Sequence, residues 1–183
     1  MTCDLLLHVC CAPDATVPWP ALSEEGYSVS GYFYSSNIHP RSEFEKRVRD
    51  VRGLAGVMGG KCIIAPYEPM NWLRAVRADI LGPEGGARCT RCIREQLLAT
   101  AGEAVARGIG SISTTLTISP HKDISVIDRV GREICGDLGL QWVFRAWRKK
   151  GGFRLSVERS SRMGFYRQNY CGCVMSIRNE RSE

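Results

Sequence analysis

Short apolar runs alternate with helical patterns along most of the chain, and no other feature restricts its fold as strongly. The predicted strands are residues 5–9, 28–34, 61–65, 111–116 and 141–144. The predicted helices between them are residues 15–25, 40–54, 68–80, 91–107 and 122–138. Strands that alternate with helices in this way form a parallel sheet with helices on both faces. We therefore expect a Rossmann-like α/β fold.

The basic C-terminal segment, residues 145–183, breaks this alternation. It is rich in Gly, Ser and Arg and carries the motif Cys171-Gly-Cys173 near its end. A chain of 183 residues fits one domain. We expect residues 1–183 to form a single α/β domain, to which residues 145–183 belong as an irregular basic tail.

The composition is that of an ordinary globular protein. Hydrophobic residues make up 44% of the chain and charged residues 24%. No run approaches the roughly 18 to 20 apolar residues that cross a membrane. The N-terminal sequence MTCDLLLHVCC lacks the basic region and the cleavage site of a secretory signal. We expect a cytoplasmic protein with no membrane partner.

Nine cysteines in such a protein indicate metal or redox chemistry, because a reducing compartment disfavours structural disulfides. Six of them form three close pairs: Cys10 with Cys11, Cys89 with Cys92, and Cys171 with Cys173. The first pair follows the first predicted strand, and ligand sites in open α/β sheets lie beyond the carboxyl ends of the strands. The isolated cysteines are Cys3, Cys62 and Cys135. They stand in apolar surroundings, where we expect small buried hydrophobic residues.

The C-x-x-C pair lies at the glycine-rich start of a predicted helix, where free N–H groups stabilise thiolate charge. Its two sulfurs can bind one metal or cluster. A zinc ribbon needs two such pairs, and this chain has one. Four thiolates, from Cys10, Cys11, Cys89 and Cys92, can hold an iron–sulfur cluster, although not with the spacing of a ferredoxin.

Asp14 and the Cys-Gly-Cys pair each allow two interpretations. Asp14 is either a hard oxygen ligand for a second metal or, as its residue type favours, a helix N-cap. The glycine between Cys171 and Cys173 permits tight backbone geometry. These two thiols either pair as a strained, reducible disulfide or reach a metal.

The run RAWRKKGGFR, residues 145–154, is the candidate for contact with nucleic acid. The formal net charge of +6 permits a nucleic-acid partner without requiring one. A run of this kind is most often a solvated face, and the functional alternative is an RNA phosphate patch with stacking aromatic residues. The candidate phosphate contacts are Arg145, Arg148, Lys149, Lys150 and Arg154, and the candidate stacking residues are Trp147 and Tyr166.

Five motifs extend over nearly the whole chain: HVCCAPD, YFYSSNIHPRSEFEKR, RCTRCIREQLLATA, STTLTISPHKD and GFYRQNYCGC. Taken in this order, they resemble the cobalamin-independent epoxyqueuosine reductases, the QueH family. The resemblance implies an oxidoreductase that reduces the epoxide of epoxyqueuosine in the anticodon of tRNA, the last step of queuosine formation. It also implies a Rossmann-like core related to adenine-nucleotide hydrolases, and an external electron donor.

The same resemblance implies roles for the paired cysteines. Those that match the ligands of a [4Fe-4S] cluster are Cys10, Cys11, Cys89 and Cys92. Cys171 and Cys173 match a pair regarded either as a redox-active dithiol or as ligands near the active metal.

Asp14 marks a departure from the family pattern. Many members read CCAPC or CCGPC where this chain has CCAPD, and a carboxylate favours a hard, Lewis-acidic iron. Removal of an epoxide oxygen needs two electrons, whereas a cluster usually passes one at a time, so we expect a second centre. That centre is either a mononuclear iron bound by Cys11, Asp14 and one Cys-Gly-Cys thiol, or the Cys171/Cys173 dithiol. We favour the iron, with Asp14, Cys171 and Cys173 as the catalytic candidates.

Two other functions compete with this one. A non-catalytic, zinc-binding RNA module predicts a colourless protein that contains zinc. A thiol-disulfide oxidoreductase or PP-loop nucleotide enzyme is the other alternative. HVCCAPD stands where an SGGxDS-like phosphate loop would follow the first strand, which argues against the use of ATP.

Overall fold

Five parallel strands form one sheet, in the order β3-β2-β1-β4-β5, in the computed structural model, which describes residues 3–177. The strands are β1 (Cys3–His8), β2 (Tyr27–Phe33), β3 (Cys62–Ile64), β4 (Ser111–Thr114) and β5 (Gln141–Trp142). From the central β1 the chain builds outward first through β2 and β3, and then on the other side through β4 and β5. The direction of winding switches between β1 and β4, and open α/β sheets bind ligands at such a point.

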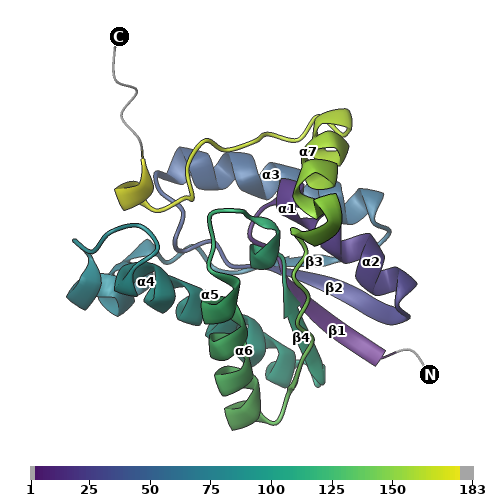
Figure 1. The fold of residues 1–183 in the computed structure, drawn as a ribbon, viewed down its shortest axis with the longest axis horizontal. Coiled ribbons are helices and arrows are strands. Elements are labelled where there is room, and N and C mark those ends of the chain that lie inside the picture. The colour runs from purple at the N-terminus through teal and green to yellow at the C-terminus, as the bar shows by residue number, and fades with distance from the viewer. Residues whose placement is uncertain (1–2, 178–183) are drawn as a thin grey trace.

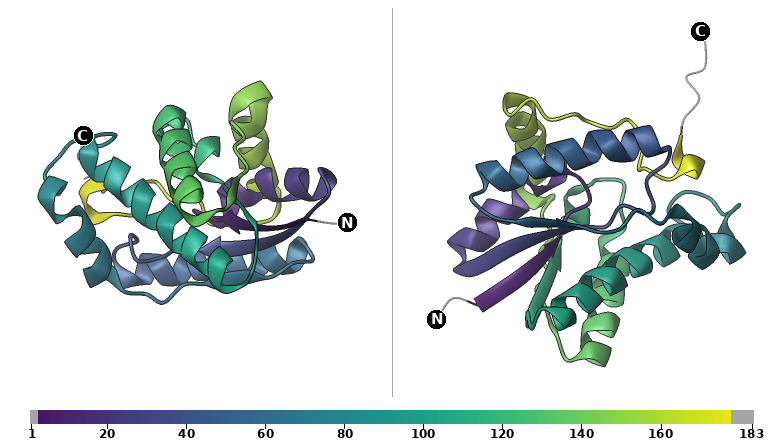
Figure 2. Two further views of the ribbon diagram at one scale, coloured as in Figure 1. Left: turned by 90° about the horizontal axis from the view of Figure 1, so that it is seen from below. Right: turned by 180° about the vertical axis from the view of Figure 1, so that it is seen from behind.

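Helices cover both faces of the sheet, which confirms the predicted fold class (Figures 1 and 2). One face carries α1 (Ala12–Ala15), α2 (Pro18–Glu24), α3 (Arg41–Val57) and α7 (Gly152–Arg162), and the other carries α4 (Pro69–Val76), α5 (Ala87–Ala106) and α6 (Ile124–Leu138). Short 3-10 turns are η1 (Arg77–Asp79), η2 (Leu116–Ile118), η3 (Lys149–Gly151) and η4 (Val174–Ser176). Neighbouring residues of a strand point to opposite faces. Leu5 and Leu7 of β1 therefore pack in the core under the first group of helices, and Leu6 packs in the core under the second.

The helix α7 lies in the segment for which we expect no regular structure. Its buried residues, Gly152, Ser156 and Ser160, recur at every fourth position. The hydroxyls of both serines donate to backbone carbonyls of the preceding turn, so they are buried without an unpaired donor. A buried face made of small and polar residues carries no hydrophobic periodicity, and for this reason the sequence pattern does not reveal the helix.

Two other helix boundaries differ from the expected ones. The sequence predicts a helix over residues 15–25 that Pro18 and Pro20 break. In the structure α1 ends at Ala15 and α2 begins at Pro18, which occupies the first turn, where no backbone donor is needed, and Pro20 lies within α2. The helix α5 begins at Ala87, which places Cys89 and Cys92 in its first two turns. None of the helices within residues 3–177 combines the length and the apolar composition of a membrane-crossing segment.

Candidate functional site

The carboxyl ends of β1 and β4 are joined where the first cysteine pair begins. The backbone N–H of Cys10, just after β1, donates to Oγ1 of Thr115, just after β4, at 3.0 Å. Cys11 is the N-cap residue of α1, and its backbone is extended. Asp14 is the third residue of that short helix, so the prediction that it caps a helix is wrong. Its side chain is instead part of a cavity wall.

Two cavities show which cysteines the fold brings together. A small one is lined by all four cysteines of the second and third pairs, Cys89, Cys92, Cys171 and Cys173. A larger one, of about 190 Å³, has Cys10, Asp14 and Cys171 among its lining residues. Cys171 and Lys122 line both cavities, so they lie at the junction between the two groups. The Cys-Gly-Cys segment therefore lies beside the C-x-x-C pair and reaches toward Cys10.

Lys122 is a half-buried cation at this junction. Its Nζ lies 2.9 Å from Sγ of Cys171. Burial alone would lower the pKa of Lys122, but the sulfur of Cys171 raises it above its ordinary value. Burial in turn raises the pKa of Cys171, and Lys122 opposes that rise. The pair places a positive charge next to a sulfur that faces the large cavity.

Arg148 holds the loop that carries Lys122. Its Nη1 donates to the carbonyls of Ser119 at 3.1 Å, Pro120 at 3.4 Å and Lys122 at 2.7 Å. The sequence suggests Arg148 as a phosphate contact, whereas the structure uses its guanidinium within the protein. The explanation is geometric, because three carbonyls of one loop lie within hydrogen-bond distance of a single nitrogen, Nη1.

The adjacent thiols of Cys10 and Cys11 differ in environment. A hydrogen bond with Cys11 lowers the pKa of Cys10, and the same bond together with burial raises the pKa of Cys11. Cys11 is 1% exposed, and its sulfur accepts from Nε2 of Gln168 at 3.1 Å. Burial also raises the pKa of Asp14, to about 6. Of the two thiols, Cys10 is the one that lines the large cavity.

The thiols of the C-x-x-C pair accept hydrogen bonds from N–H donors. Sγ of Cys92 lies 3.2 Å from the indole Nε1 of Trp72 in α4 and 3.2 Å from Nε2 of Gln96 in α5. Sγ of Cys89 accepts from the backbone N–H of Gly85 at 3.2 Å. Burial raises the pKa of Cys92 well above its ordinary value. Such donors suit a sulfur that carries negative charge, as a metal-bound thiolate does.

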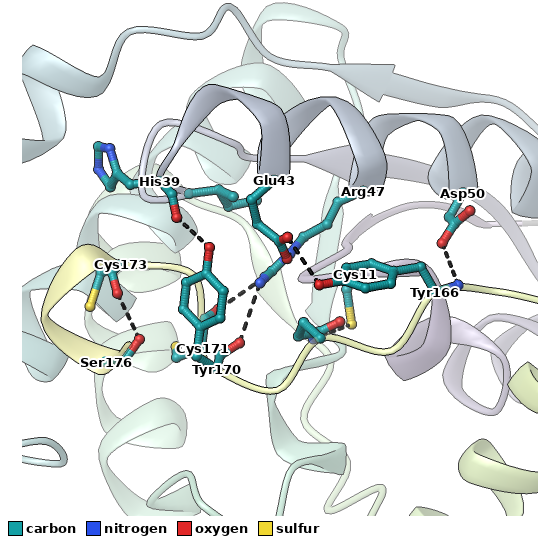
Figure 3. A network of polar contacts seen from close by, with 12 residues as sticks. Cys11, His39, Glu43, Arg47, Asp50, Tyr166, Tyr170, Cys171, Cys173 and Ser176 are labelled. Carbon is teal, nitrogen blue, oxygen red and sulfur yellow. Dashed lines mark hydrogen bonds and ion pairs between the residues drawn. The ribbon is translucent and has the colours of Figure 1, made fainter. Parts of the chain in front are cut away.

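A buried ion pair on α3 holds the Cys-Gly-Cys segment in place (Figure 3). Nε of Arg47 donates to Glu43 at 2.8 Å, and their side chains are 2% and 6% exposed. The other guanidinium nitrogens of Arg47 donate to the carbonyls of Cys171 at 3.0 Å and Tyr170 at 3.3 Å. The hydroxyl of Tyr166 donates to the second oxygen of Glu43 at 3.0 Å. One residue of α3 therefore fixes the backbone on which Cys171 is carried.

Gly172 is required by this arrangement. Its φ is +134°, a backbone conformation that favours glycine. A Cβ at this position would lie 3.2 Å from Nη1 of Arg47 and 3.4 Å from Ile38. The glycine of the motif thus lets the segment approach α3 closely enough to accept the hydrogen bonds from Arg47.

The residues expected to bind tRNA divide into two groups. Lys149, Lys150 and Arg154 are exposed. Arg145 is exposed too, but it pairs with Glu25 at 2.8 Å. The two aromatic side chains expected to stack on bases also have partners within the protein: the half-buried Trp147 donates from its indole to the carbonyl of Thr114 at 3.0 Å, and Tyr166 binds Glu43.

The expectation for the isolated cysteines holds for Cys135, which is 2% exposed. Cys62 is half-buried at the start of β3. Cys3 is exposed, and the prediction of burial is wrong there, because β1 begins at this residue, outside the covered part of the sheet.

All nine cysteines are free thiols. Within residues 3–177, no three Cys, His, Asp or Glu side chains are gathered closely enough to hold a single metal ion. The donor chemistry nevertheless fits an iron–sulfur cluster, because thiols from separate elements converge on one region. The nearby cations, Lys122 and Arg47, oppose the accumulated negative charge.

Several residues that shape the site are absent from the expectations of the sequence analysis. They are Glu43, Arg47, Trp72, Gln96, Lys122 and Gln168. A signal exists for the first two, since Glu43 and Arg47 are four residues apart and fall on the buried face of α3 beside Val48 and Val51. Charges on an apolar helix face indicate a buried pair. The others become recognisable only when α4, α5, the loop before α6 and the segment after α7 are placed around the cysteines.

Comparison with known proteins gives one consistent result. A family model described as "Epoxyqueuosine reductase QueH" matches residues 5–179. A protein named epoxyqueuosine reductase QueH from Thermotoga maritima is 38% identical over 182 residues, which cover 98% of this chain and 93% of that protein. Its namesake from Streptococcus pyogenes serotype M1 is 34% identical over 181 residues, which cover 96% of this chain and 71% of that protein.

A solved structure shares the fold. It is described as a predicted subunit of tRNA methyltransferase from Methanocaldococcus jannaschii, and it superposes with a TM-score of 0.57 over 87% of this chain and 74% of its own. The sequence identity is 13%, so this likeness concerns the arrangement of strands and helices alone.

Proposed function

The chain belongs to the epoxyqueuosine reductase QueH family, and from that premise we propose that it reduces the epoxide of epoxyqueuosine in tRNA with a [4Fe-4S] cluster as cofactor. The observation that supports the proposed cofactor is the convergence of the three cysteine pairs at the switch point of the sheet. Cys171 faces both the C-x-x-C pair and Cys10. Redox-active and substrate-accessible sulfur groups are therefore contiguous.

The proposed cluster ligands come from these pairs. The family resemblance selects Cys10, Cys11, Cys89 and Cys92, and the small cavity adds Cys171 and Cys173 as neighbours of the C-x-x-C pair. When bound, the cluster supplies electrons that it receives singly from an external donor. The chain itself excludes bulk water from three of the six sulfurs, since Cys11, Cys92 and Cys173 are buried.

The reaction consumes two electrons and two protons, breaks both C–O bonds of the epoxide and releases the oxygen as water. Oxidation of the Cys171 and Cys173 thiols to a disulfide would release two electrons and two protons, the number required. A mononuclear iron with Asp14 as a ligand is the other proposal for the second centre. In either case, Lys122 places a positive charge beside the cavity, where negative charge develops on the departing oxygen.

The tRNA contacts that we propose are the exposed residues Lys149, Lys150 and Arg154, next to the first turn of α7. Neither Arg145 nor Arg148 is needed for this proposal, because both guanidinium groups have partners in the protein. Replacement of one exposed cation should weaken binding of all substrate tRNAs alike and reduce the slope of affinity against salt by about 1.

Anaerobically purified protein tests the cofactor. We expect a brown sample with a broad absorbance band at about 400 nm and about four irons per chain. Cys92→Ser should remove the band, and Cys135→Ser should retain it, because Cys135 is a buried cysteine of α6 that lines neither cavity. A colourless wild-type protein with one zinc would overturn the cofactor and support a zinc-binding RNA module.

The reaction is tested separately by mass analysis of the tRNA. Incubation of the reduced protein with epoxyqueuosine-containing tRNA should convert the modified nucleoside to a product that has lost one oxygen atom. If the nucleoside is unchanged while the cluster is intact and reduced, the proposed activity is wrong even though the cofactor is right.

A further inference from the structure

Two kinds of residue line the large cavity. We group Cys10, Asp14 and Cys171 as its inner wall, because they carry the sulfur and carboxylate groups, and Phe153 with Arg167 as its outer part. Arg167 is exposed, and its Cζ lies 5.7 Å from the centroid of the Phe153 ring. Arg167 and Asp14 both line this cavity, so the guanidinium and the carboxylate border the same space.

The position of Phe153 is set by the entry into α7. A Cβ at Gly152 would lie 1.8 Å from the carbonyl oxygen of Trp147, so only glycine allows the helix to begin there. Trp147 is itself anchored by its indole N–H on the carbonyl of Thr114, at the end of β4. The aromatic ring at the second position of α7 is therefore held at a constant place relative to the switch point.

We propose that Phe153 and Arg167 form a stacking subsite for the nucleobase of the substrate nucleotide, at the mouth of the cavity that leads to Cys10 and Cys171. The inference rests on the proposed function. The reactive ring of the substrate is a substituent of the base, so when it meets the inner wall the base occupies the outer part of the cavity. A base taken out of its anticodon stack loses its neighbours, and an aromatic ring with a stacked guanidinium replaces them.

The size of the cavity limits its occupant to one nucleotide. Pockets that enclose drug-sized ligands measure about 300–1,000 Å³, and this one measures about 190 Å³. The neighbouring anticodon bases must then stay outside, near the exposed cations Lys149 and Lys150. The subsite and the phosphate contacts are thus separate parts of one tRNA-binding surface.

Steady-state kinetics and equilibrium binding with epoxyqueuosine-containing tRNA test the subsite. Phe153→Leu should raise both KM and Kd about 5- to 150-fold, with a smaller change in kcat. This factor corresponds to the free energy of stacking one base on an aromatic side chain. Phe153→Trp should remain close to wild type, because stacking requires an aromatic face rather than a phenyl ring in particular. Iron content and melting temperature, measured on each variant, identify any that fail to fold or to load.

Arg167 separates stacking from charge. Arg167→Lys keeps the positive charge but not the planar guanidinium, so it should lose as much affinity for the tRNA as Arg167→Gln. Neither variant should change the slope of affinity against salt as much as Lys150→Gln does. Full rescue by Arg167→Lys, with a reduced salt slope in Arg167→Gln, would make Arg167 a phosphate contact and overturn the proposal. Wild-type Kd in Phe153→Leu and Arg167→Gln would also overturn it. Failure of the wild-type protein to reduce its tRNA, with binding affected as expected, would instead refute the proposed function.

Discussion

Replacement of Arg47 by methionine should release the Cys-Gly-Cys segment and destabilise the protein. The change leaves Glu43, 6% exposed, without its cation, and it removes the donors to the carbonyls of Tyr170 and Cys171. Removing one partner of a buried pair costs about 3–5 kcal/mol. A chain of this size loses about 2–4 °C of melting temperature per kcal/mol. The expected decrease is therefore about 6–20 °C.

Arg41→Met is the matched control on the same helix. Arg41 pairs with Glu45 at the same spacing of four residues, at 3.1 Å, but the side chains are 74% and 59% exposed. An exposed pair contributes about 0–1 kcal/mol, so this control should melt within a few degrees of wild type. The double variant Arg47→Met/Glu43→Leu should recover part of the loss, because it also removes the unpaired carboxylate.

The assay is thermal unfolding followed by circular dichroism, together with the rate at which Cys171 is alkylated in metal-free, reduced protein. Arg47→Met should increase that rate, because the segment no longer has its anchor on α3, while Arg41→Met should not. Equal melting temperatures for the two single variants, with equal alkylation rates, would show that the Arg47–Glu43 pair neither stabilises the fold nor positions the cysteine.

Three further changes test other parts of the site. Gly172→Ala should cost about 1–3 kcal/mol in urea denaturation, because φ is +134° and a Cβ would crowd Arg47; an unchanged midpoint would contradict this. If the second centre is a mononuclear iron, the wild type should hold about five irons per chain and Asp14→Ala about four, and equal iron contents would rule out the second iron. Burial lowers the pKa of His8 from 6.5 to about 3, so the unfolded state binds a proton that the folded state does not. The stability of metal-free protein should then fall as the pH decreases from about 6.5 toward 3, and His8→Gln should fall less steeply over the same range.

The local chemistry of the site could be predicted before the structure. The alternation of apolar runs and helical patterns determines a parallel sheet, because each strand must be covered on both faces. The position of Cys10 and Cys11 after β1 then places them at the ligand-binding edge of that sheet, as observed. Motif spacing likewise brings Cys89 and Cys92 together, since both lie in the first turns of one helix.

The contacts that bring the cysteine pairs together join segments far apart in the chain. Residues 163–177 return across α3, where Arg47 and Glu43 bind them. Arg47 and Cys171, which are joined by one of these hydrogen bonds, are 124 positions apart in the sequence. The helix α7 packs through small and polar residues, so no hydrophobic periodicity in the sequence predicts it. Lys122 meets Cys171 through the loop that Arg148 holds. The sequence by itself determined the sheet and the cysteine pairs, because these follow from local periodicity and spacing. The arrangement of the pairs around two adjoining cavities was decided by tertiary structure, because it depends on hydrogen bonds between elements far apart in the chain.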